Sequence, residues 1–271
     1  MQMRDRVLTT ALASLALLAS GPALARGHDA PDPIEEMRLG PVAPAPMGYI
    51  EFCQREGADC PMAPGATTPF DKSYWSLAFQ QAERSNFGRQ KPASMRRFFR
   101  SFGSARQQRP PVPAATRVSS QAGDKAIVLS RRVWDEIAQV NAAVNDEIVA
   151  TPDLAVWKVD DYWSLPVGPR HRRRGDCEDY VLQKRHDLLA RGYPQEALSV
   201  ALVRTRWGEH HAVLIVETTS GAFVLDSLSS HIAPWSALDY LWVVRQNPAD
   251  PSQWVEIAGQ AKNTAPWAPG A

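Results

Sequence analysis

Hydrophobic residues first recur at helical spacing in the segment 130–148. They stand three or four positions apart there, which predicts an amphipathic helix of about five turns. A second helix is predicted from the motif around Cys177 to Ala190, before the helix breakers Gly192 and Pro194. Four aliphatic residues make up its expected buried side: Val181, Leu182, Leu188 and Leu189.

The hydrophobic pattern changes after Gly192. Residues 198–205, 211–218 and 222–228 are apolar on both faces in their middles, which predicts strands in the centre of a sheet. A tight turn is expected at 218–221, and a further strand at 240–246. Helices that precede an antiparallel sheet indicate an α+β domain.

The N-terminus has the three parts of a secretory signal peptide. Arg4 and Arg6 form a basic start, residues 8–19 form a short apolar run, and Ala23-Leu24-Ala25 is a small-x-small cleavage site. The apolar run is too short to span a bilayer, which needs about 20 residues. We therefore predict that residues 1–25 are a signal peptide, cleaved after Ala25, and that the mature chain is exported.

The rest of the chain is expected to hold one globular domain with irregular flanks. Residues 26–47 are rich in Pro and Gly and predict a flexible lead-in, residues 48–246 form the expected domain, and residues 247–271 form a tail. Inside the domain, residues 84–123 contain nine basic residues and no acidic one. A nucleic-acid or anionic-surface patch would explain this composition, but the clustered prolines favour a flexible insertion.

The total charge gives no indication of a nucleic-acid or membrane partner. The full chain has 30 Lys and Arg residues against 29 Asp and Glu residues. Removal of the signal peptide takes away Arg4, Arg6 and Asp5, so that basic and acidic residues become equal in number. We therefore expect no nucleic-acid partner.

The three cysteines are interpreted for an oxidising compartment, because the chain is expected to be exported. Cys53 and Cys60 are close enough in sequence to form a disulfide around Gly57, which leaves Cys177 over. A leftover cysteine in an exported protein indicates an intermolecular bridge, a free reactive thiol or an inert buried residue. The spacing of the cysteines is not that of a structural zinc site.

Cys177 stands between Asp176 and Glu178 at the predicted start of the second helix. The positive end of the helix dipole favours a thiolate there, whereas the two acidic neighbours oppose it. An imidazole close to the sulfur would favour the thiolate, and an acid would orient that imidazole. The predicted strands therefore need to supply a histidine and an acid on one face.

A hairpin that turns at Thr219 and Ser220 would place Glu217 opposite Ala222. Because side chains alternate along a strand, this register puts the candidate base and acid, His211 and Asp226, on one face and His210 on the other. A one-residue change in the turn would reverse the choice of histidine. Taken alone, His211 would be an ordinary strand histidine and Asp226 a turn-capping acid. Together with Cys177, the two residues favour a catalytic triad.

Five stretches of the sequence resemble one family. They are "GDCEDYVLQKRHDLLARGYP", "GEHHAVLIVET", "FVLDSL", "YIEFCQREGADC" and "VDDYWSLP", and they cover most of residues 48–246. They are similar to the bacterial transglutaminase-like cysteine proteases, whose best-known members are the LapG-type periplasmic enzymes that release adhesins. The resemblance implies a papain-like, transglutaminase-like core and a triad of Cys177, His211 and Asp226. In the family the histidine precedes Ala-Val, which agrees with the choice of His211.

The resemblance also implies a role for the acids around the cysteine. In LapG-type members they bind calcium, so Asp176 and Glu178 would be ligands here, with Asp179 a weaker candidate. Hard carboxylate oxygens suit calcium, and a bound cation would cancel the negative charge beside Cys177. Asp176 as the N-cap and Glu178 as a first-turn acid explain the same residues without a metal, and the two roles are compatible.

By resemblance, the protein is an exported, calcium-dependent cysteine endopeptidase of the periplasm. It would cleave a large surface adhesin near its N-terminus, control attachment in a biofilm, and be regulated by an inner-membrane receptor that responds to a cyclic dinucleotide. A transglutaminase-like acyl transferase with the same triad and a non-catalytic calcium-dependent binding module are the alternatives. The basic run at 170–174 would steer an acidic substrate or lower the pKa of Cys177, unless it is simply a solvated loop.

Overall fold

The computed structural model describes residues 34–57, 60 and 125–258. The predicted signal peptide at 1–25 and the predicted basic insertion at 84–123 lie outside the described residues. Among the helices of the described part, none is both long enough and apolar enough to cross a membrane.

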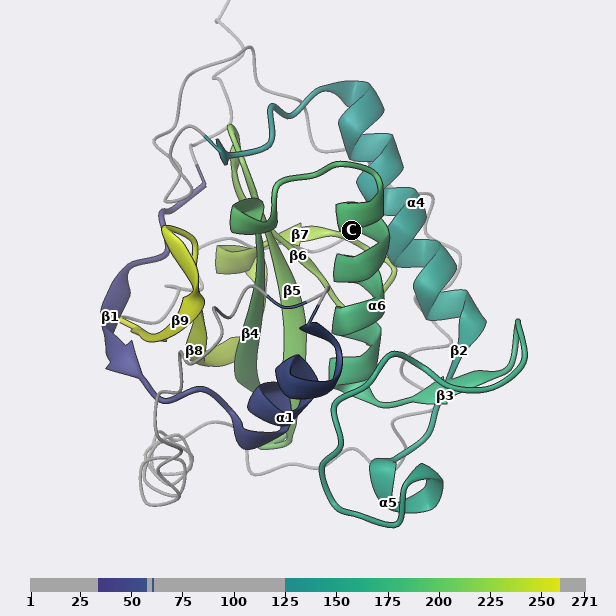
Figure 1. Cartoon of the computed structure of the whole chain (residues 1–271). Helices are drawn as coiled ribbons and strands as arrows, with labels where there is room; N and C mark the ends of the chain where they lie inside the picture. The colour runs from purple at the N-terminus through teal and green to yellow at the C-terminus, as the bar shows by residue number, and fades with distance from the viewer. Residues whose placement is uncertain (1–33, 58–59, 61–124, 259–271) are drawn as a thin grey trace, which may run out of the picture. The chain divides into compact units, whose positions relative to one another are not determined.

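Within the described residues, seven strands form an antiparallel sheet in the order β1-β9-β8-β4-β5-β6-β7 (Figure 1). The two inner strands β4 and β5 are almost entirely buried, because side chains cover both faces of the sheet there. The strands are β1 (Leu39–Ala43), β4 (Leu198–Thr205), β5 (His210–Thr218), β6 (Gly221–Leu225), β7 (Ala233–Pro234), β8 (Tyr240–Asn247) and β9 (Asp250–Ile257).

The α+β class and the four predicted strands are confirmed, with small differences at the strand ends. The segment 198–205 is β4, and 211–218 lies within β5, which begins one residue earlier. The segment 240–246 lies within β8. The expected strand 222–228 ends at Leu225 in the structure, so Asp226 follows β6 and belongs to a connecting segment.

The sheet extends beyond the expected domain at both ends. β1 lies in the expected lead-in 26–47 and β9 in the expected tail 247–271, and these two strands pair with each other. The sequence pattern does not predict β1 and β9, because Pro41 and Pro251 interrupt short runs that include polar residues. Proline is tolerated on an edge strand such as β1 and near the start of a strand such as β9. The folded domain therefore extends beyond the expected boundaries 48 and 246.

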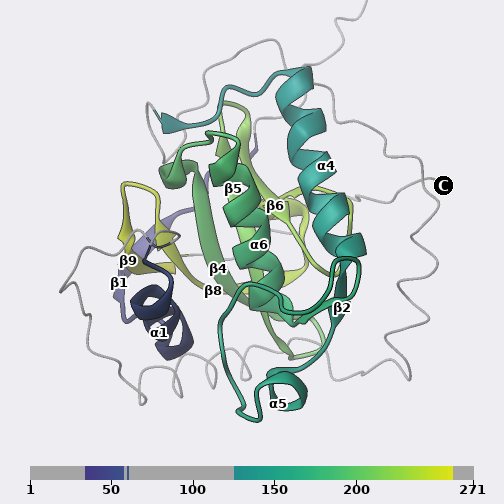
Figure 2. The same ribbon diagram turned by 45° about the vertical axis from the view of Figure 1, so that its right-hand side comes forward.

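Both predicted long helices are present on one face of the sheet (Figure 2). They are α4 (Arg131–Glu147) and α6 (Cys177–Ala190). α6 packs against β5, and α4 packs against α6. α4 also reaches the sheet, since the rings of Trp134 and Phe223 lie 5.1 Å apart in an edge-to-face contact. α6 is thus enclosed between the sheet and a second helix.

Enclosure makes α6 more buried than an amphipathic pattern predicts. Val181, Leu182 and Leu188 are buried as expected, and Leu189 is half-buried. Three polar residues of α6 are buried as well: Gln183, Lys184 and Arg185. A helix that is buried on most sides can place functional groups away from water at its first turn.

Three short elements surround the start of α6: β2 (Ile148–Ala150), α5 (Asp153–Val156) and β3 (Arg173–Gly175). β2 and β3 pair in parallel, with Ala150 opposite Gly175. Parallel strands end at the same edge, so the residues that follow them are neighbours. The pairing therefore brings the first turn of α5 beside the first turn of α6.

Helix α1 (Met47–Arg55) is joined to this region through its C-terminal end. The predicted disulfide between Cys53 and Cys60 is present, with a Cα–Cα distance of 5.2 Å. Arg55 donates a hydrogen bond to the carbonyl of Trp163 at 2.6 Å and lies 4.2 Å from the centre of the Tyr162 ring. α1 therefore holds the loop that connects α5 to β3.

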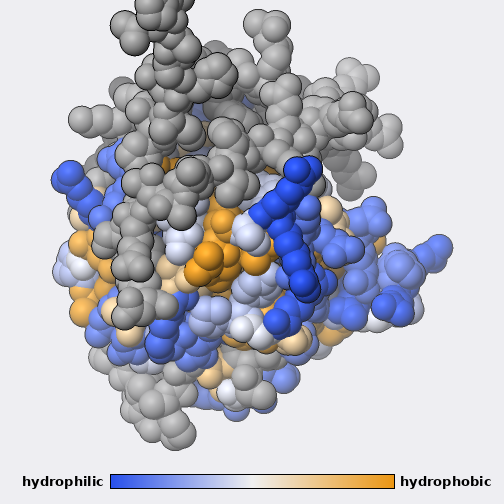
Figure 3. Space-filling model, turned by 90° about the horizontal axis from the view of Figure 1, so that it is seen from above, coloured by the Kyte–Doolittle hydropathy of each residue, from blue (hydrophilic) through white to orange (hydrophobic). Residues whose placement is uncertain are grey.

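Two short 3-10 helices, Gln195–Ala197 and Trp235–Ala237, complete the described elements. Figure 3 shows the surface at the end of the sheet away from the start of α6, where its described residues form a central hydrophobic patch bordered by hydrophilic ones. The most exposed large hydrophobic residue of the described part is Val128, at 73%. The chemistry expected from the sequence lies at the other end.

A buried ion pair joins β5 to β8 across β4. Arg245 Nη1 lies 2.8 Å from Glu217 Oε1, and both side chains are shielded from water. We expect Glu217→Ala to lower the free energy of unfolding by about 3–5 kcal/mol, because it leaves a buried guanidinium without its partner. Glu196→Ala removes the partner of the exposed Lys125 and should cost less than about 1 kcal/mol. Urea denaturation of both variants measures this, and equal losses would contradict the assignment.

Candidate active site

Cys177 is the first residue of α6, and Asp176 occupies the N-cap position as predicted. The backbone N–H of Asp176 donates to Asp179 Oδ2 at 3.3 Å, the return hydrogen bond of a capping box. The side chain of Asp176 reaches the neighbouring helix, where its Oδ2 accepts from the N–H of Asp153 at 3.3 Å. Asp176 thus links the starts of α5 and α6.

The surroundings of the Cys177 thiol oppose its ionisation. Burial, followed by the adjacent charge of Glu178 and a hydrogen bond from the thiol to Glu178 Oε2 at 3.1 Å, raises the pKa of Cys177 well above its ordinary value. A hydrogen bond from the backbone N–H of Ala212 acts in the opposite direction. The acidic neighbours therefore make this cysteine a poorer thiolate, as their charge suggests.

The basic run before Cys177 is a solvated loop for the most part. Arg170, Arg172 and Arg174 are exposed. Arg173 is half-buried and contacts Gln183 Oε1 at 2.8 Å and Glu147 Oε1 at 3.3 Å, so it joins β3 to α4 and α6. The arginines do not produce the lowered pKa of Cys177 that they suggested in the sequence, since that pKa is raised.

The β5–β6 hairpin has the predicted register. Glu217 pairs with Ala222, and the turn consists of Thr219 and Ser220. His211 consequently lies on the same face of β5 as Val213 and Ile215, with 5% of its surface exposed, whereas His210 on the other face is exposed. The alternation of side chains along β5 thus selects His211.

His211 and Asp226 meet in a buried hydrogen bond. His211 Nε2 lies 2.8 Å from Asp226 Oδ1, which also accepts from the N–H of Leu228 at 2.8 Å. Burial alone would raise the pKa of Asp226, but the neighbouring His211 and hydrogen bonds from His211, Tyr240 and Leu228 outweigh burial and lower it. An ionised Asp226 requires the proton of His211 on Nε2, which leaves Nδ1 as the basic nitrogen.

Of the three residues predicted as a triad, His211 and Asp226 are in direct contact, and Cys177 begins α6, which packs against β5. The thiol of Cys177 lies at the backbone N–H of Ala212, the residue that follows His211 in the chain. Lys184, two turns further along α6, is fully buried, and its pKa is lowered to about 7 by burial, against the opposing effect of the Asp226 charge. His211 and Asp226 therefore form one buried pair, and the thiol of Cys177 contacts the strand that carries His211.

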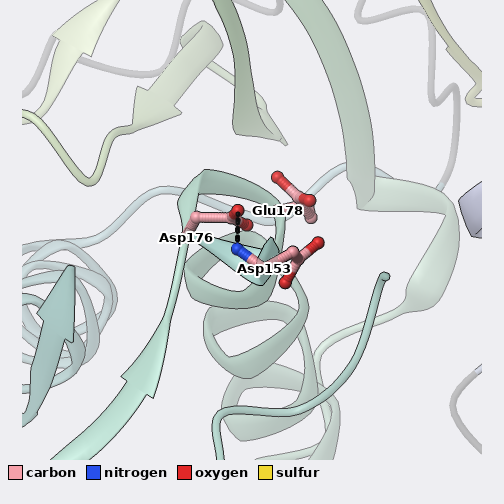
Figure 4. A group of neighbouring side chains, drawn as sticks. All are labelled: Asp153, Asp176 and Glu178. Atoms are coloured by element: carbon pink, nitrogen blue, oxygen red, sulfur yellow. Dashed lines mark hydrogen bonds between the residues drawn. The ribbon is translucent and has the colours of Figure 1, made fainter. Parts of the chain in front are cut away.

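A group of carboxylates lies directly beside the thiol. Asp153, Asp176 and Glu178 each place one ligand atom within 4.8 Å of the others, and Figure 4 shows the three side chains converging from α5 and the start of α6. The predicted candidates Asp176 and Glu178 are in the group. Asp153 is a member that the sequence did not indicate, because only the parallel β2–β3 pairing brings it close.

Asp179, the weaker calcium candidate, has a different role in the structure. Its Oδ1 accepts from the N–H of Ser164 at 2.9 Å, and its Oδ2 accepts from the N–H of Asp176. Both oxygens are thus used to fix backbone groups. Burial, with the nearby charges of Asp176 and Asp153, raises the pKa of Asp179 to about 8.

The carboxylate group fits a hard cation. Asp153 Oδ1 and Asp176 Oδ1 are buried without a hydrogen-bond partner among the described residues, which is costly for carboxylate oxygens. Burial raises the pKa of Asp153 to about 6 and that of Glu178 well above its ordinary value, and the charge of Asp176 adds to both shifts. Buried oxygens that lack donors and repel each other match the ligand set that calcium prefers.

Comparison with known proteins identifies the family. A family model described as bacterial transglutaminase-like cysteine proteinase matches residues 113–262. The chain belongs to this family. The matched residues include all three members of the predicted triad and the carboxylate group. No curated protein sequence matched the chain.

Solved structures of LapG from Legionella pneumophila are similar to this family member. The EGTA-treated structure is 31% identical and covers 42% of this chain and 62% of its own, with a TM-score of 0.36. A second LapG structure is 31% identical and covers 42% of this chain and 63% of its own, with a TM-score of 0.36. A calcium-bound LapG structure is 28% identical and covers 49% of this chain and 73% of its own, with a TM-score of 0.38. The chain thus spans about three fifths of the length of the first two structures.

The raised pKa values of Asp153 and Asp179 predict how the stability of this proteinase depends on pH. The folded-state pKa values of Asp153 and Asp179, about 6 and about 8, exceed the ordinary aspartate value of about 4. Their contribution to stability is therefore fully present below about pH 4 and is lost as the pH rises through each folded pKa. We expect the free energy of unfolding in EGTA to fall between pH 4 and pH 8.

Calcium should reduce this fall, because a cation favours the ionised carboxylates in the folded state. Chemical denaturation at several pH values, in EGTA and in excess calcium, measures both curves. A fall of the same size in both conditions would contradict the metal assignment.

Proposed function

We propose that this family member is an exported, calcium-dependent cysteine endopeptidase in which Cys177 is the nucleophile, His211 the base and Asp226 the orienting acid. The observation that carries the proposal is the buried 2.8 Å contact between His211 and Asp226, next to the thiol of Cys177 at a helix N-terminus. A nucleophile, a base and an acid in this order form the unit used for acyl transfer from peptides.

The residues divide the reaction between them. His211 takes the thiol proton at Nδ1, and the Cys177 sulfur attacks the peptide carbonyl carbon to form a tetrahedral adduct. As the C–N bond breaks, His211 returns the proton to the leaving amine, and a thioester remains on Cys177. Water, deprotonated by His211, then releases the acid and regenerates the thiol. Asp226 keeps the imidazole oriented throughout and stabilises its protonated form.

Asp153, Asp176 and Glu178 are the residues that would hold calcium. When bound, calcium would supply positive charge beside three carboxylates that otherwise disfavour a thiolate. Glu178 links this site to the nucleophile, because its carboxylate accepts the thiol hydrogen of Cys177 and its charge raises the pKa of that thiol. A Glu178 carboxylate that is occupied as a ligand no longer holds the thiol hydrogen.

The substrate, the location and the regulator are proposed from the resemblance of the sequence. We place the mature protein in the periplasm, because the N-terminus has the three parts of a signal peptide. The substrate would be a large surface adhesin cut near its N-terminus, which would release cells from a biofilm. An inner-membrane receptor that responds to a cyclic dinucleotide would bind and restrain the enzyme.

Two adjacent histidines provide a matched test of the proposed base. We expect His211→Asn to lower the rate of peptide cleavage by at least about 10³-fold, whereas His210→Asn should stay close to the wild type, because His210 is exposed on the other side of β5. The assay uses the mature chain from residue 26, calcium and the N-terminal region of an adhesin as substrate. Equal effects of the two substitutions would overturn the assignment of His211.

The same assay separates the proposed activity from its alternatives. Mass spectrometry of the products with an added primary amine distinguishes a free acid, expected for an endopeptidase, from an amide formed by acyl transfer. Cys177→Ser should abolish cleavage. Full biological function in Cys177→Ser would instead favour a non-catalytic calcium-dependent binding module.

Asp153→Asn tests the calcium ligands independently of cleavage. We expect at least about a 10-fold loss of calcium affinity by isothermal titration calorimetry, because the substitution removes one charged ligand. Asp160→Asn, at an exposed position in the segment that follows α5, is the control and should bind calcium like the wild type. In the wild type, the pH midpoint of Cys177 alkylation should be lower with calcium than with EGTA. Unchanged calcium affinity in Asp153→Asn would remove Asp153 from the site.

A further inference from the structure

The carboxylate of Asp226 is held at both of its oxygens. Oδ1 accepts from His211 Nε2 and from the backbone N–H of Leu228. Oδ2 accepts a short hydrogen bond from the hydroxyl of Tyr240. Asp226 lies beyond the end of β6, so strand pairing does not fix its side chain. The orientation of this carboxylate therefore depends on its hydrogen-bond donors.

Tyr240 is itself firmly placed. It is the first residue of β8, where it pairs with Thr205 of β4. Its ring stacks edge-to-face on Trp242 at 6.1 Å, and Trp242 stacks on Trp235 at 5.8 Å in the core on the opposite face of the sheet from α6. A ring fixed by strand pairing and by a buried aromatic pair can hold another side chain in one rotamer.

The same ring also borders the imidazole. The centres of the Tyr240 and His211 rings lie 5.9 Å apart, with an angle of 61° between their planes. Tyr240 thus contacts both members of the buried pair, the acid through its hydroxyl and the base through its ring. This double contact limits the rotation of Asp226 and of His211.

We propose that Tyr240 is a positioning residue of the active site, which holds the Asp226 carboxylate so that Oδ1 faces His211 Nε2 and keeps Nδ1 of the imidazole free for proton transfer. The inference rests on the proposed function, in which His211 acts through Nδ1. Tyr240 acts through Asp226 and His211 and is not assigned any contact with the substrate.

The hydroxyl has an electrostatic effect in addition. It is one of the hydrogen bonds that lower the pKa of the buried Asp226 carboxyl. An ionised Asp226 selects the tautomer of His211 that carries its proton on Nε2. Without the hydroxyl, the carboxylate could turn away from the imidazole, and the tautomer with the proton on Nδ1 would become populated.

Tyr240→Phe removes this hydroxyl and keeps the ring. Tyr193→Phe is the matched control, because Tyr193, which follows the C-terminal end of α6, also donates to a carboxylate, Glu136 Oε2 of α4 at 2.7 Å. The protonation of the His211 ring is read from its ¹⁵N chemical shifts in the mature, calcium-loaded protein. This measurement does not require proteolytic activity, so it remains informative if the proposed function is wrong.

We expect the wild type and Tyr193→Phe to show the Nε2–H tautomer of His211, and Tyr240→Phe to show a mixture of both tautomers. In the cleavage assay, Tyr240→Phe should lower kcat by about 10-fold or more with KM changed less than about 2-fold, because positioning acts on the chemical step. An unchanged tautomer and an unchanged kcat in Tyr240→Phe would overturn the proposal. A lower Tm without a tautomer change would also overturn it, since Tyr240 would then have a structural role only.

Discussion

The two-residue turn between β5 and β6 determines the geometry of the candidate site. It places Glu217 opposite Ala222, and the alternation of side chains then carries this register back along β5 to His211. One residue more or less in the turn would direct His210 toward Asp226 and expose His211. The proposed nucleophile contacts the same strand, because the sulfur of Cys177 lies at the N–H of Ala212. The proposed base and acid are thus placed by a single hairpin, which also contacts the thiol.

The start of α6 combines two conflicting demands. A helix N-terminus stabilises negative charge, and Asp176 and Asp179 cap it accordingly. The burial of α6 between the sheet and α4 nevertheless makes charge expensive there, and Asp153 and Glu178 add two more carboxylates. Evolution keeps such arrangements at functional sites rather than in ordinary cores. The disfavoured charge beside Cys177 is therefore better explained by chemistry than by stability.

Sequence patterns revealed the parts of this site that depend on local periodicity. Helical spacing predicts α4 and α6, and strand alternation distinguishes His211 from His210. The sequence does not indicate Asp153, because the pairing of β2 with β3 determines its neighbours in space. These strands have only three residues each, too few to show a hydrophobic alternation. The role of Tyr240 is not predicted for a similar reason. Tyr240 lies in β8 and Asp226 follows β6, and these two strands are not adjacent in the sheet. Long-range pairing, unlike periodicity, leaves little trace in one sequence.

The pairing of β1 with β9 has a consequence for how the chain folds. These are the first and last described strands, so more than two hundred residues separate contacts such as that between Leu39 and Ile257. Contacts of such high sequence separation slow folding, because a long loop must close before they form. The sheet cannot be completed until residue 257 is available. If the chain crosses a membrane in the unfolded state, its sheet would therefore stay incomplete while the chain crosses. Strand β9 would pair only after the C-terminal residues have crossed.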